Sequence, residues 1–562
     1  MEKQKLTPLK RFWLLLKPDK IEIRNIYIYA IFIGLINLSL PIGIQAIINL
    51  IQGGAVSTSW IVLIFFVVGG IAISGILQIK QLHITENLQQ KVFARAAFEF
   101  AYRVPRIKLE RLHKHYTPEL MNRFFDIVSV QKALPKIMID FSSAGIEAFF
   151  GLVLLSLYHP FFILFSLFLI IIVFVILRLT VRRGLETSLD ESKRKYQIAH
   201  WLQEVAKANY TFKLAGETQL PLNEVNSKTE GYVRARESHF SVLVSQYGLM
   251  VGFKALVAFG LLLIGGLLVI EQELNIGQFV AAEIIILLVM NSIEKIMLNF
   301  DTIYDILTSL EKIAQVTDLE LDTEGGIRLQ EGDTKGLEVN LNQVTFEYPE
   351  ENKTVLNNIN LDIASGERVV ISGQNDSGKS TLLYVIGGLY SPSRGSIVVD
   401  SIPVNNYCPE SLRNGIGGYL RDESLFEGTL LENITLGRDG ATFENVRWAT
   451  ESLGLSKLIN DLPYGYDTRV LPQGRQFSKS TIAKILIARS IVDRPRLLLL
   501  ENSFSVFSEE DRKNILQFLL DHENDWTVLL TSSQPLENLK DLKYRQVVLD
   551  KGEVIDIKDI SC

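Results

Sequence analysis

Cysteine is almost absent from the sequence, which contains only Cys408 and Cys562 among its 562 residues. Two thiols cannot build the disulfide framework that holds small secreted domains together, and nothing in the sequence indicates an oxidising compartment. The chain also lacks the polar bias of disordered and collagen-like proteins, because 48% of its residues are hydrophobic. This composition and length favour a membrane protein with more than one domain.

Charge is missing from long stretches of the first half. Between Arg24 and Lys80 lie 55 residues without Asp, Glu, Lys or Arg, and a helix needs about 20 apolar residues to cross a bilayer. Glycine and hydroxyl residues at 52–59 divide this run in two. A second uncharged run, 148–177, is divided at Pro160, which suits the first turn of a new helix. With two later apolar stretches, six spans are predicted: Ile26–Ile51, Trp60–Ile79, Ile137–Leu157, Phe161–Val181, Tyr247–Ile270 and Leu274–Ile293.

Basic residues predict the orientation of these spans, because cytoplasmic loops hold an excess of Lys and Arg. The first 24 residues hold seven, and segment 80–136 holds 11 against 5 acidic residues. The short loops at 52–59, 156–160 and 271–273 hold none. We therefore expect a multi-pass integral membrane protein in the lipid bilayer with both termini cytoplasmic, in the plasma (inner) membrane if the source is bacterial.

Two segments of this half, 80–136 and 182–245, are too long for turns and mix apolar with charged residues at helical spacing. We expect them to continue the spans into the cytosol as long amphipathic helices; independent soluble subdomains are the alternative. Few ionisable residues lie at membrane depth: Glu147, Lys254 and Glu283. Because a charge in hydrocarbon is costly, they should face a cavity or one another. A Lys254–Glu283 pair and a contact with substrate are both open.

The charge balance changes sign along the chain. Residues 1–300 carry 31 basic and 22 acidic side chains, whereas residues 301–562 carry 26 basic and 41 acidic ones. An acidic second half does not support a nucleic-acid partner, since binding to phosphate backbones depends on positive charge. Short apolar strand-like runs alternate there with helical segments, which is the pattern of an α/β domain.

The strongest local motif of the second half is G-x-x-x-x-G-K-S at 373–380, between a strand-like run at 368–372 and a helical segment. In this context the glycines let backbone N–H groups close around phosphate oxygens, and the helix N-terminus adds positive potential. Lys379 would reach the β- and γ-phosphates, and Ser380 offers a hydroxyl to Mg²⁺. The expected cofactors are therefore ATP and Mg²⁺, and the expected ATP-binding residues are Gly373, Gln374, Asn375, Asp376, Ser377, Gly378, Lys379, Ser380 and Thr381.

Six spans followed by one phosphate-loop domain resemble an ABC exporter half-transporter. Residues 425–434 and 462–468 resemble the segments after the Q-loop and before the signature of that family, and 274–278 resembles the opening of its sixth span. Residues 116–134 resemble the first intracellular loop of the protein- and peptide-secretion branch (type 1 secretion, haemolysin-exporter-like). Only about 25 residues precede the first span, so no peptidase domain is expected. By this resemblance, Tyr348 is the aromatic residue that stacks on adenine.

The fold class that follows is a multi-domain membrane protein: an all-α six-helix transmembrane domain of ABC exporter type plus an α/β P-loop NTPase domain. We expect a cytoplasmic N-terminal segment at 1–25 and a transmembrane domain with two long intracellular loops at 26–315. An acidic linker at 316–336 should lead to the ABC nucleotide-binding domain at 337–562.

The sequence departs from the family pattern at the motifs that serve hydrolysis. The Q-loop glutamine position holds Arg421, the catalytic glutamate position holds Asn502, and the switch histidine position holds Ser533. The acidic residue for the Mg²⁺ shell is Glu501, one methylene longer than aspartate. The signature becomes Phe477, Ser478, Lys479, Ser480 and Thr481, without glycine.

These substitutions predict that ATP binding survives better than hydrolysis. Asn502 can hydrogen-bond a water but cannot act as a base, and a positioned base contributes about 10²–10⁴-fold. No catalytic residue is assigned, and slow intrinsic hydrolysis is expected. The alternative is that Glu501 or a water network takes the place of the missing base. Because the resemblance implies a composite site between two chains, a homodimer and a heterodimer with a second half-transporter are both open.

The leading functional hypothesis is an ATP-binding exporter subunit that couples nucleotide binding, with slow or partner-dependent hydrolysis, to export of a protein or peptide. By the same resemblance, its partners would include a second half-transporter and, in a secretion system, a periplasmic adaptor and an outer-membrane channel. One alternative is a non-transporting, ATP-sensing regulatory membrane subunit. Another, within transporters, is a lipid flippase.

Overall fold

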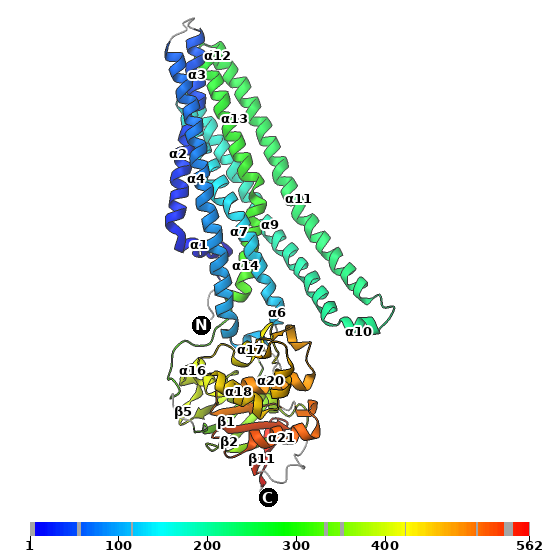
Figure 1. Ribbon diagram of the computed structural model, residues 1–562. Helices are drawn as coiled ribbons and strands as arrows, with labels where there is room; N and C mark the ends of the chain where they lie inside the picture. The colour runs from blue at the N-terminus through cyan, green and yellow to red at the C-terminus, as the bar shows by residue number, and fades with distance from the viewer. Residues whose placement is uncertain are drawn as a thin grey trace. The chain divides into compact units, whose positions relative to one another are not determined.

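The computed structural model describes residues 6–52, 58–113, 116–330, 335–348, 353–421, 423–501, 504–532 and 543–560. The chain divides into two compact units. One comprises residues 1–105 and 115–319, and the other comprises residues 106–114 and 320–562. Figure 1 shows the first unit as long helices and the second as helices and strands.

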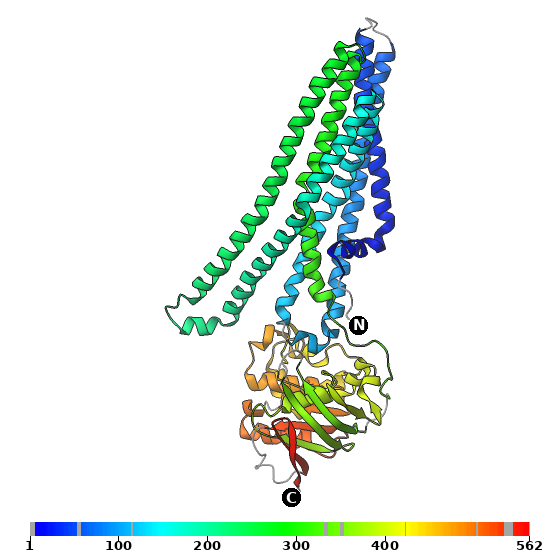
Figure 2. The same ribbon diagram turned by 180° about the vertical axis from the view of Figure 1, so that it is seen from behind.

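The first unit is helical, and within its described residues six helical stretches are long and apolar enough to cross a membrane, as the sequence predicts. Figure 2, a view from behind, shows these helices running alongside one another. Their apolar side chains are largely exposed, as Phe65 at 80% and Phe66 at 73% illustrate, which is expected of a surface that faces lipid. The helices of this unit are α1 (Pro8–Leu16), α2 (Lys20–Asn37), α3 (Ser39–Gln52), α4 (Thr58–Arg103), α6 (Thr117–Leu120), α7 (Asp126–Pro135), α8 (Ser142–Ser156), α9 (Pro160–Lys207), α10 (Asn209–Leu214), α11 (Leu220–Gly260), α12 (Gly266–Ile270), α13 (Ile276–Leu298) and α14 (Phe300–Thr317).

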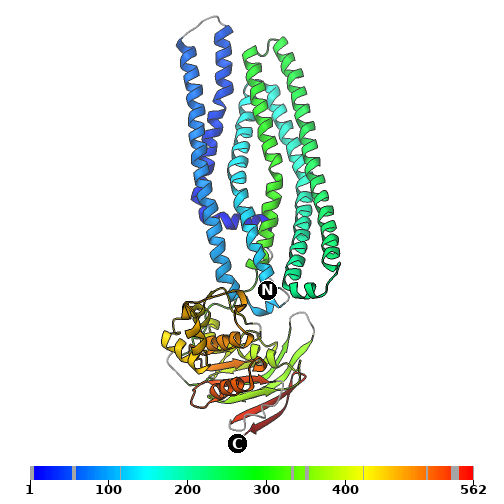
Figure 3. The same cartoon turned by 45° about the vertical axis from the view of Figure 1, so that its right-hand side comes forward.

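In segment 182–245, the second of the two long segments between spans, the helices of the neighbouring spans continue without a break. Helix α9 runs for 48 residues and α11 for 41 residues. The short helix α10 joins them into a hairpin, seen in Figure 3. Thus segment 182–245 is an extension of two spans and not an independent subdomain.

The first span differs in one detail from the single helix predicted at Ile26–Ile51. It is interrupted at Leu38, which ends α2 before α3 begins at Ser39. Pro41 lies in the first turn of α3. Because proline lacks an N–H group and clashes with the preceding turn, it ends one helix and starts another at this point.

The second unit is built on a six-stranded sheet with the strand order β12-β11-β3-β10-β9-β6. Strands β3 (Arg368–Ser372), β9 (Leu497–Leu500) and β10 (Thr527–Ser532) are buried along their whole length, as central parallel strands covered on both faces are. The other strands of this sheet are β6 (Ile416–Tyr419), β11 (Tyr544–Asp550) and β12 (Glu553–Ile560).

A four-stranded sheet of order β2-β1-β4-β5 and a two-stranded ribbon complete the strands of the described part of this unit. They are β1 (Val339–Glu347), β2 (Thr354–Ile363), β4 (Arg394–Val399), β5 (Ile402–Pro403), β7 (Gly428–Thr429) and β8 (Arg469–Val470). The helices of the unit are α5 (Leu109–Leu112), α15 (Lys379–Ile386), α16 (Pro409–Asn414), α17 (Leu430–Thr435), α18 (Phe443–Ser452), α19 (Ser456–Asp461), α20 (Lys479–Ile491) and α21 (Glu509–Leu520).

One segment lies in a different unit from the one its sequence position indicates. Residues 106–113 fall within the range predicted for the transmembrane domain, yet they pack with the second unit. The Lys108 N–H donates to the Glu320 carbonyl at 2.9 Å, and the Asp322 N–H donates to the Arg106 carbonyl at 2.8 Å. These bonds make a short antiparallel ladder, with Ile107 opposite Leu321.

Candidate functional site

The predicted phosphate loop lies between β3 and α15, at the carboxyl end of a central strand. Gly378, at the N-cap of α15, has φ of +98°, a conformation that residues with a side chain rarely adopt. At Gly373 a Cβ would lie 2.1 Å from the Leu549 carbonyl oxygen, so only glycine fits. Both glycines are therefore required for the loop to form.

Lys379 is the first residue of α15 and directly follows this loop. Its ammonium group donates to the carbonyl oxygens of Gly373, at 2.8 Å, and Gln374, at 2.6 Å. Partial burial lowers the pKa of Lys379 below its ordinary value. The ammonium is thus held by its own loop, beside the N-terminus of α15, where a phosphate would be stabilised.

Ser380, in α15, and Glu501, directly after β9, are brought into contact. The Ser380 hydroxyl donates to Glu501 Oε1 at 2.5 Å, and the Arg421 backbone N–H donates to Glu501 Oε2 at 2.8 Å. Glu501 is 6% exposed. A hydroxyl beside a carboxylate is the oxygen donor set that Mg²⁺ prefers, so these residues fit the expected metal.

The described residues do not form a complete metal site by themselves. Among the described residues there is no group of three or more His, Cys, Asp or Glu side chains placed to hold a metal ion. Mg²⁺ at Ser380 and Glu501 would therefore take its remaining ligands from water and nucleotide phosphates, which is its common mode of binding.

A cavity of about 870 Å³ opens over the phosphate loop. It is large enough for a nucleotide, given that ligand pockets commonly measure about 300–1,000 Å³. Three cationic side chains, Lys353, Lys379 and Arg421, line it together with the acidic Asp376 and Glu501. Its other lining residues are Tyr348, Val355, Asn375, Ser377, Gly378, Ser380, Thr381, Ser505, Val506 and Thr531.

Tyr348, which the sequence predicts to stack on adenine, is one of the residues that line this cavity. Its hydroxyl lies 3.0 Å from the Thr381 hydroxyl. Its ring is stacked on His113, with centroids 4.4 Å apart and planes at 16°. Sequence reasoning missed His113, because 235 positions separate it from Tyr348 and no motif marks it.

The five signature residues do not line the cavity of their own chain in the part that the structure describes. The Ser478 hydroxyl caps α20 by accepting the Thr481 N–H at 3.1 Å, and it lies 3.2 Å from the Ser480 hydroxyl. Lys479 is the first residue of that helix. Phe477 packs against the hydrophobic core.

Two predicted positions cannot be placed in this geometry. Asn502 and Ser533 lie outside the described residues. Their described chain neighbours are Glu501, which directly follows β9, and Ser532, the last residue of β10; the two strands are adjacent and parallel.

In the first unit, Glu147 is satisfied by neutral partners. It accepts the Asn37 amide at 2.6 Å and the Ser292 hydroxyl at 3.2 Å, which links α8 to α2 and α13. Asn37 also accepts the Ser74 hydroxyl of α4 at 3.0 Å. This cluster serves to join helices.

The pairing of Lys254 with Glu283 is wrong. Lys254 forms its ion pair with Glu294, and Glu283 has no hydrogen-bond or ion-pair partner among the described residues. Glu294 follows Glu283 by 11 residues, which is about three helical turns on the same face of α13. The sequence analysis overlooked it because it lies one residue past the predicted end of the sixth span.

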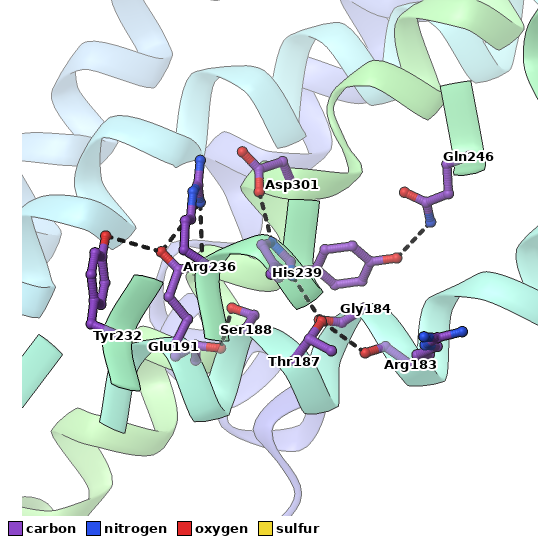
Figure 4. A network of polar contacts seen from close by, with 12 residues as sticks. Arg183, Gly184, Thr187, Ser188, Glu191, Tyr232, Arg236, His239, Gln246 and Asp301 are labelled. Carbon is purple, nitrogen blue, oxygen red and sulfur yellow. Dashed lines mark hydrogen bonds and ion pairs between the residues drawn. The ribbon is translucent and has the colours of Figure 1, made fainter. Parts of the chain in front are cut away.

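A second polar network, also unexpected from the sequence, joins α9, α11 and α14 (Figure 4). His239, 1% exposed, lies 2.9 Å from the Thr187 hydroxyl and 3.2 Å from the Asp301 carboxylate. Nearby, the Gln246 amide donates to the Tyr304 hydroxyl at 2.8 Å. Such a network holds the three helices in one register, because each buried polar group has its partner on another helix.

Two family models match this chain. The model described as ABC transporter matches residues 356–505, and the model described as ABC transporter transmembrane region matches residues 23–293. The matched regions contain the phosphate loop and the six predicted spans.

Among curated proteins, the chain is similar to a leukotoxin export ATP-binding protein of Aggregatibacter actinomycetemcomitans, with 30% identity over 56% of this chain and 44% of that protein. A leukotoxin translocation ATP-binding protein of Mannheimia haemolytica is 29% identical over 56% of this chain and 44% of its own length. The chain thus matches less than half the length of these relatives.

Among solved structures, the fold resembles that of a bacterial Atm1-family ABC exporter with ATP bound. The TM-score is 0.81, with 19% identity, and the match covers 96% of this chain and 95% of that one. The likeness shows a shared fold over both units.

Proposed function

Because this chain belongs to the ABC transporter family, as an exporter half-transporter with a transmembrane region fused to one ATP-binding domain, we propose that ATP binding in its loop cavity drives export of a protein or peptide. The observation that carries the proposal is the cavity of about 870 Å³, in which Lys379, Ser380 and Glu501 meet at the carboxyl ends of the central strands. This arrangement offers positive charge, a helix N-terminus and two oxygen donors for a metal bound to a triphosphate.

Binding can drive such a transporter even where hydrolysis is slow. A ligand shifts an equilibrium between two conformations by its differential affinity for them. In this proposal Ser380 and Glu501 hold Mg²⁺, and Lys379 leaves the loop carbonyls to contact the phosphates. Asn502 and Ser533, at the positions of the catalytic glutamate and the switch histidine, make hydrolysis slow or dependent on a second half-transporter.

The nature of the cargo rests on the relatives, whose names describe leukotoxin export and translocation. A protein or peptide cargo for this chain is proposed on that similarity. The corresponding assembly would pair it with a second half-transporter, and with an adaptor and an outer-membrane channel if the cell has two membranes.

ATP binding by the purified chain in lipid nanodiscs tests the first part of the proposal. Lys379→Ala should weaken Mg²⁺–ATP binding at least about tenfold, since a hydrogen bond to a charged group contributes about 1.5–3 kcal/mol. Lys457→Ala is the matched control, because Lys457 is an exposed residue of α19 that does not line the cavity. Failure of the unmodified chain to bind ATP would contradict the proposal.

Transport in inside-out proteoliposomes tests the second part. ATP-dependent uptake of fluorescent polypeptides, lost in Lys379→Ala, is the expected result. Movement of labelled phospholipid without polypeptide uptake would instead identify a flippase. ATP binding without either activity, alone and with a candidate second half-transporter, would identify a sensing subunit.

A further inference from the structure

The segment 106–113 is held on the nucleotide-binding unit by polar contacts along its length. Arg106 pairs with Glu410 at 2.7 Å, and Glu110 accepts the Ser391 backbone N–H at 2.7 Å. Lys108 and Arg111 both pair with Glu320, and these two cations lower the pKa of that carboxyl. Leu109 packs against the hydrophobic core of the unit. This segment is therefore a docked part of the unit.

The last described residue of this segment, His113, stacks on Tyr348, which lines the nucleotide cavity. Its imidazole lies nearly parallel to the Tyr348 ring, with centroids 4.4 Å apart and planes at 16°. At this distance and angle the two rings are stacked in close contact. The His113 side chain is exposed, whereas the Tyr348 ring is half-buried at the cavity edge.

The other aromatic neighbours of Tyr348 approach it from the core. Phe346 and Tyr390 are 1% and 7% exposed, and both rings stand nearly perpendicular to Tyr348, at 84° and 85°. The Tyr348 hydroxyl is fixed near the buried Thr381, directly after the phosphate loop. The solvent side of the ring is thus the side that a base could reach, and His113 is the exposed ring already stacked on Tyr348.

We propose that His113 occupies the face of Tyr348 on which the base of a bound nucleotide stacks, so that imidazole and adenine compete for one aromatic surface. This inference deepens the proposed function and rests on it, because it names the regulation of the same ATP site. The phosphate subsite, formed by Lys379 and Ser380, stays accessible while His113 is stacked. Nucleotide entry therefore begins with the phosphates and is completed when His113 leaves the ring.

The competition links base binding to the segment that connects α4 to α6. Residues 106–113 follow α4, which ends at Arg103, and precede α6, which begins at Thr117. Removal of His113 from Tyr348 must change the end of this docked segment. By the reciprocity of linked equilibria, docking of the segment weakens nucleotide binding by the same factor as nucleotide binding weakens docking.

The test compares two ligands in the full-length protein in nanodiscs: ATP, which carries the base, and inorganic tripolyphosphate, which does not. Dissociation constants come from displacement of a fluorescent ATP analogue for the unmodified chain, His113→Ala, Tyr348→Ala and the double variant. His522→Ala is the matched control, since His522 is an exposed histidine of the same unit and lies outside the cavity lining. His113 is exposed, so its removal should leave the fold intact.

His113→Ala should tighten ATP binding about threefold to tenfold. This is the ratio of dissociation constants that corresponds to the energy of one aromatic pair. Tripolyphosphate affinity should stay unchanged, and the effect of His113→Ala on ATP should vanish in the Tyr348→Ala background. His113→Phe, which keeps a stacking ring, should behave like the unmodified chain.

Weaker or unchanged ATP binding in His113→Ala would overturn the inference. Weaker binding would make His113 a partner of the base, and unchanged binding would show that the stack does not compete. The proposed function would survive both outcomes, because in both of them the unmodified chain still binds ATP.

Discussion

Arg421 places a guanidinium in the cavity where the family resemblance leads one to expect a neutral glutamine. Its backbone N–H holds Glu501, and its side chain lines the cavity with Lys353 and Lys379. This extra cation can neutralise part of the charge of a triphosphate that Mg²⁺ otherwise neutralises.

Arg421→Gln should therefore weaken ATP binding most when Mg²⁺ is removed. We expect a loss of about fivefold to tenfold in EDTA, the size of one exposed charge-assisted contact, and a smaller loss with Mg²⁺. Arg447→Gln, on α18 and paired only with Glu451 among the described residues, is the control. Equal losses with and without Mg²⁺ would contradict this role for Arg421.

Glu423, near Arg421, titrates at an unusual pH. Burial raises the pKa of Glu423 to about 7, although the Leu420 N–H at 3.1 Å and the nearby Arg489 oppose the shift. A carboxyl whose pKa is higher in the folded than in the unfolded state binds more protons when folded. Its contribution to stability is present in full at low pH and is lost as the pH rises from about 4.5 to about 7.

Glu423→Gln should remove this pH dependence. At pH 8 the variant should be more stable than the unmodified chain by about 3 kcal/mol, since the Glu423 pKa rises from 4.5 to about 7 on folding and each pKa unit corresponds to about 1.4 kcal/mol. At pH 5 the difference should be small. Thermal unfolding of both proteins between pH 5 and pH 8 measures this. A difference that does not grow with pH would show that Glu423 is charged in the folded protein at neutral pH.

At the scale of elements, Gly184 shows how closely α9 and α14 approach. A Cβ at this position would lie 2.3 Å from Cζ of Tyr304, whose ring is fully buried. The hydroxyl on the same ring accepts the Gln246 amide N–H of α11, so three helices depend on the position of Tyr304.

Gly184→Ala should destabilise the helical unit by about 1–3 kcal/mol, the usual cost of overpacking. Gly248→Ala on α11 should be neutral or slightly stabilising, because a Cβ there meets nothing within 4 Å and alanine favours helix. Thermal aggregation of the detergent-solubilised proteins compares them. Equal midpoints for the two variants would mean that Tyr304 moves aside at no cost.

The elements that the sequence predicted well are those with a local signal. Runs of apolar residues gave the six spans, and the spacing of Gly373, Gly378 and Lys379 gave the strand, loop and helix of the phosphate site. Hydrophobic length and motif spacing are properties of neighbouring residues, so one sequence suffices to detect them.

The parts that the sequence could not predict depend on residues far apart in the chain. The stack of His113 on Tyr348, the network around His239 and the docking of residues 106–113 have no local pattern. Glu294, the partner of Lys254, lies only one residue past the predicted end of the sixth span. Which carboxylate pairs with Lys254 depends on the exact end of that span and on which face of α13 meets α11. Tertiary packing decides each of these.

At the scale of the whole molecule, the altered motifs predict a large dependence on a partner. The purified chain alone should hydrolyse ATP about 10²–10⁴-fold more slowly than the same chain with a half-transporter that supplies a catalytic base, the usual contribution of such a group. Phosphate release from reconstituted proteins, with Lys379→Ala as the background control, measures this. Fast hydrolysis by the chain alone would show that Glu501 or a bound water replaces the missing base.

The hairpin of α9 and α11 also has a mechanical consequence. A helix of 48 residues is about 70 Å long, and hydrocarbon accounts for about 30 Å of that length, so about 40 Å of α9 projects beyond it. A tilt of about 5° at the membrane surface would displace α10 by about 3–4 Å at the far end of this arm. Small angular changes between the apolar ends of these helices are thereby amplified into displacements as large as a hydrogen-bond length.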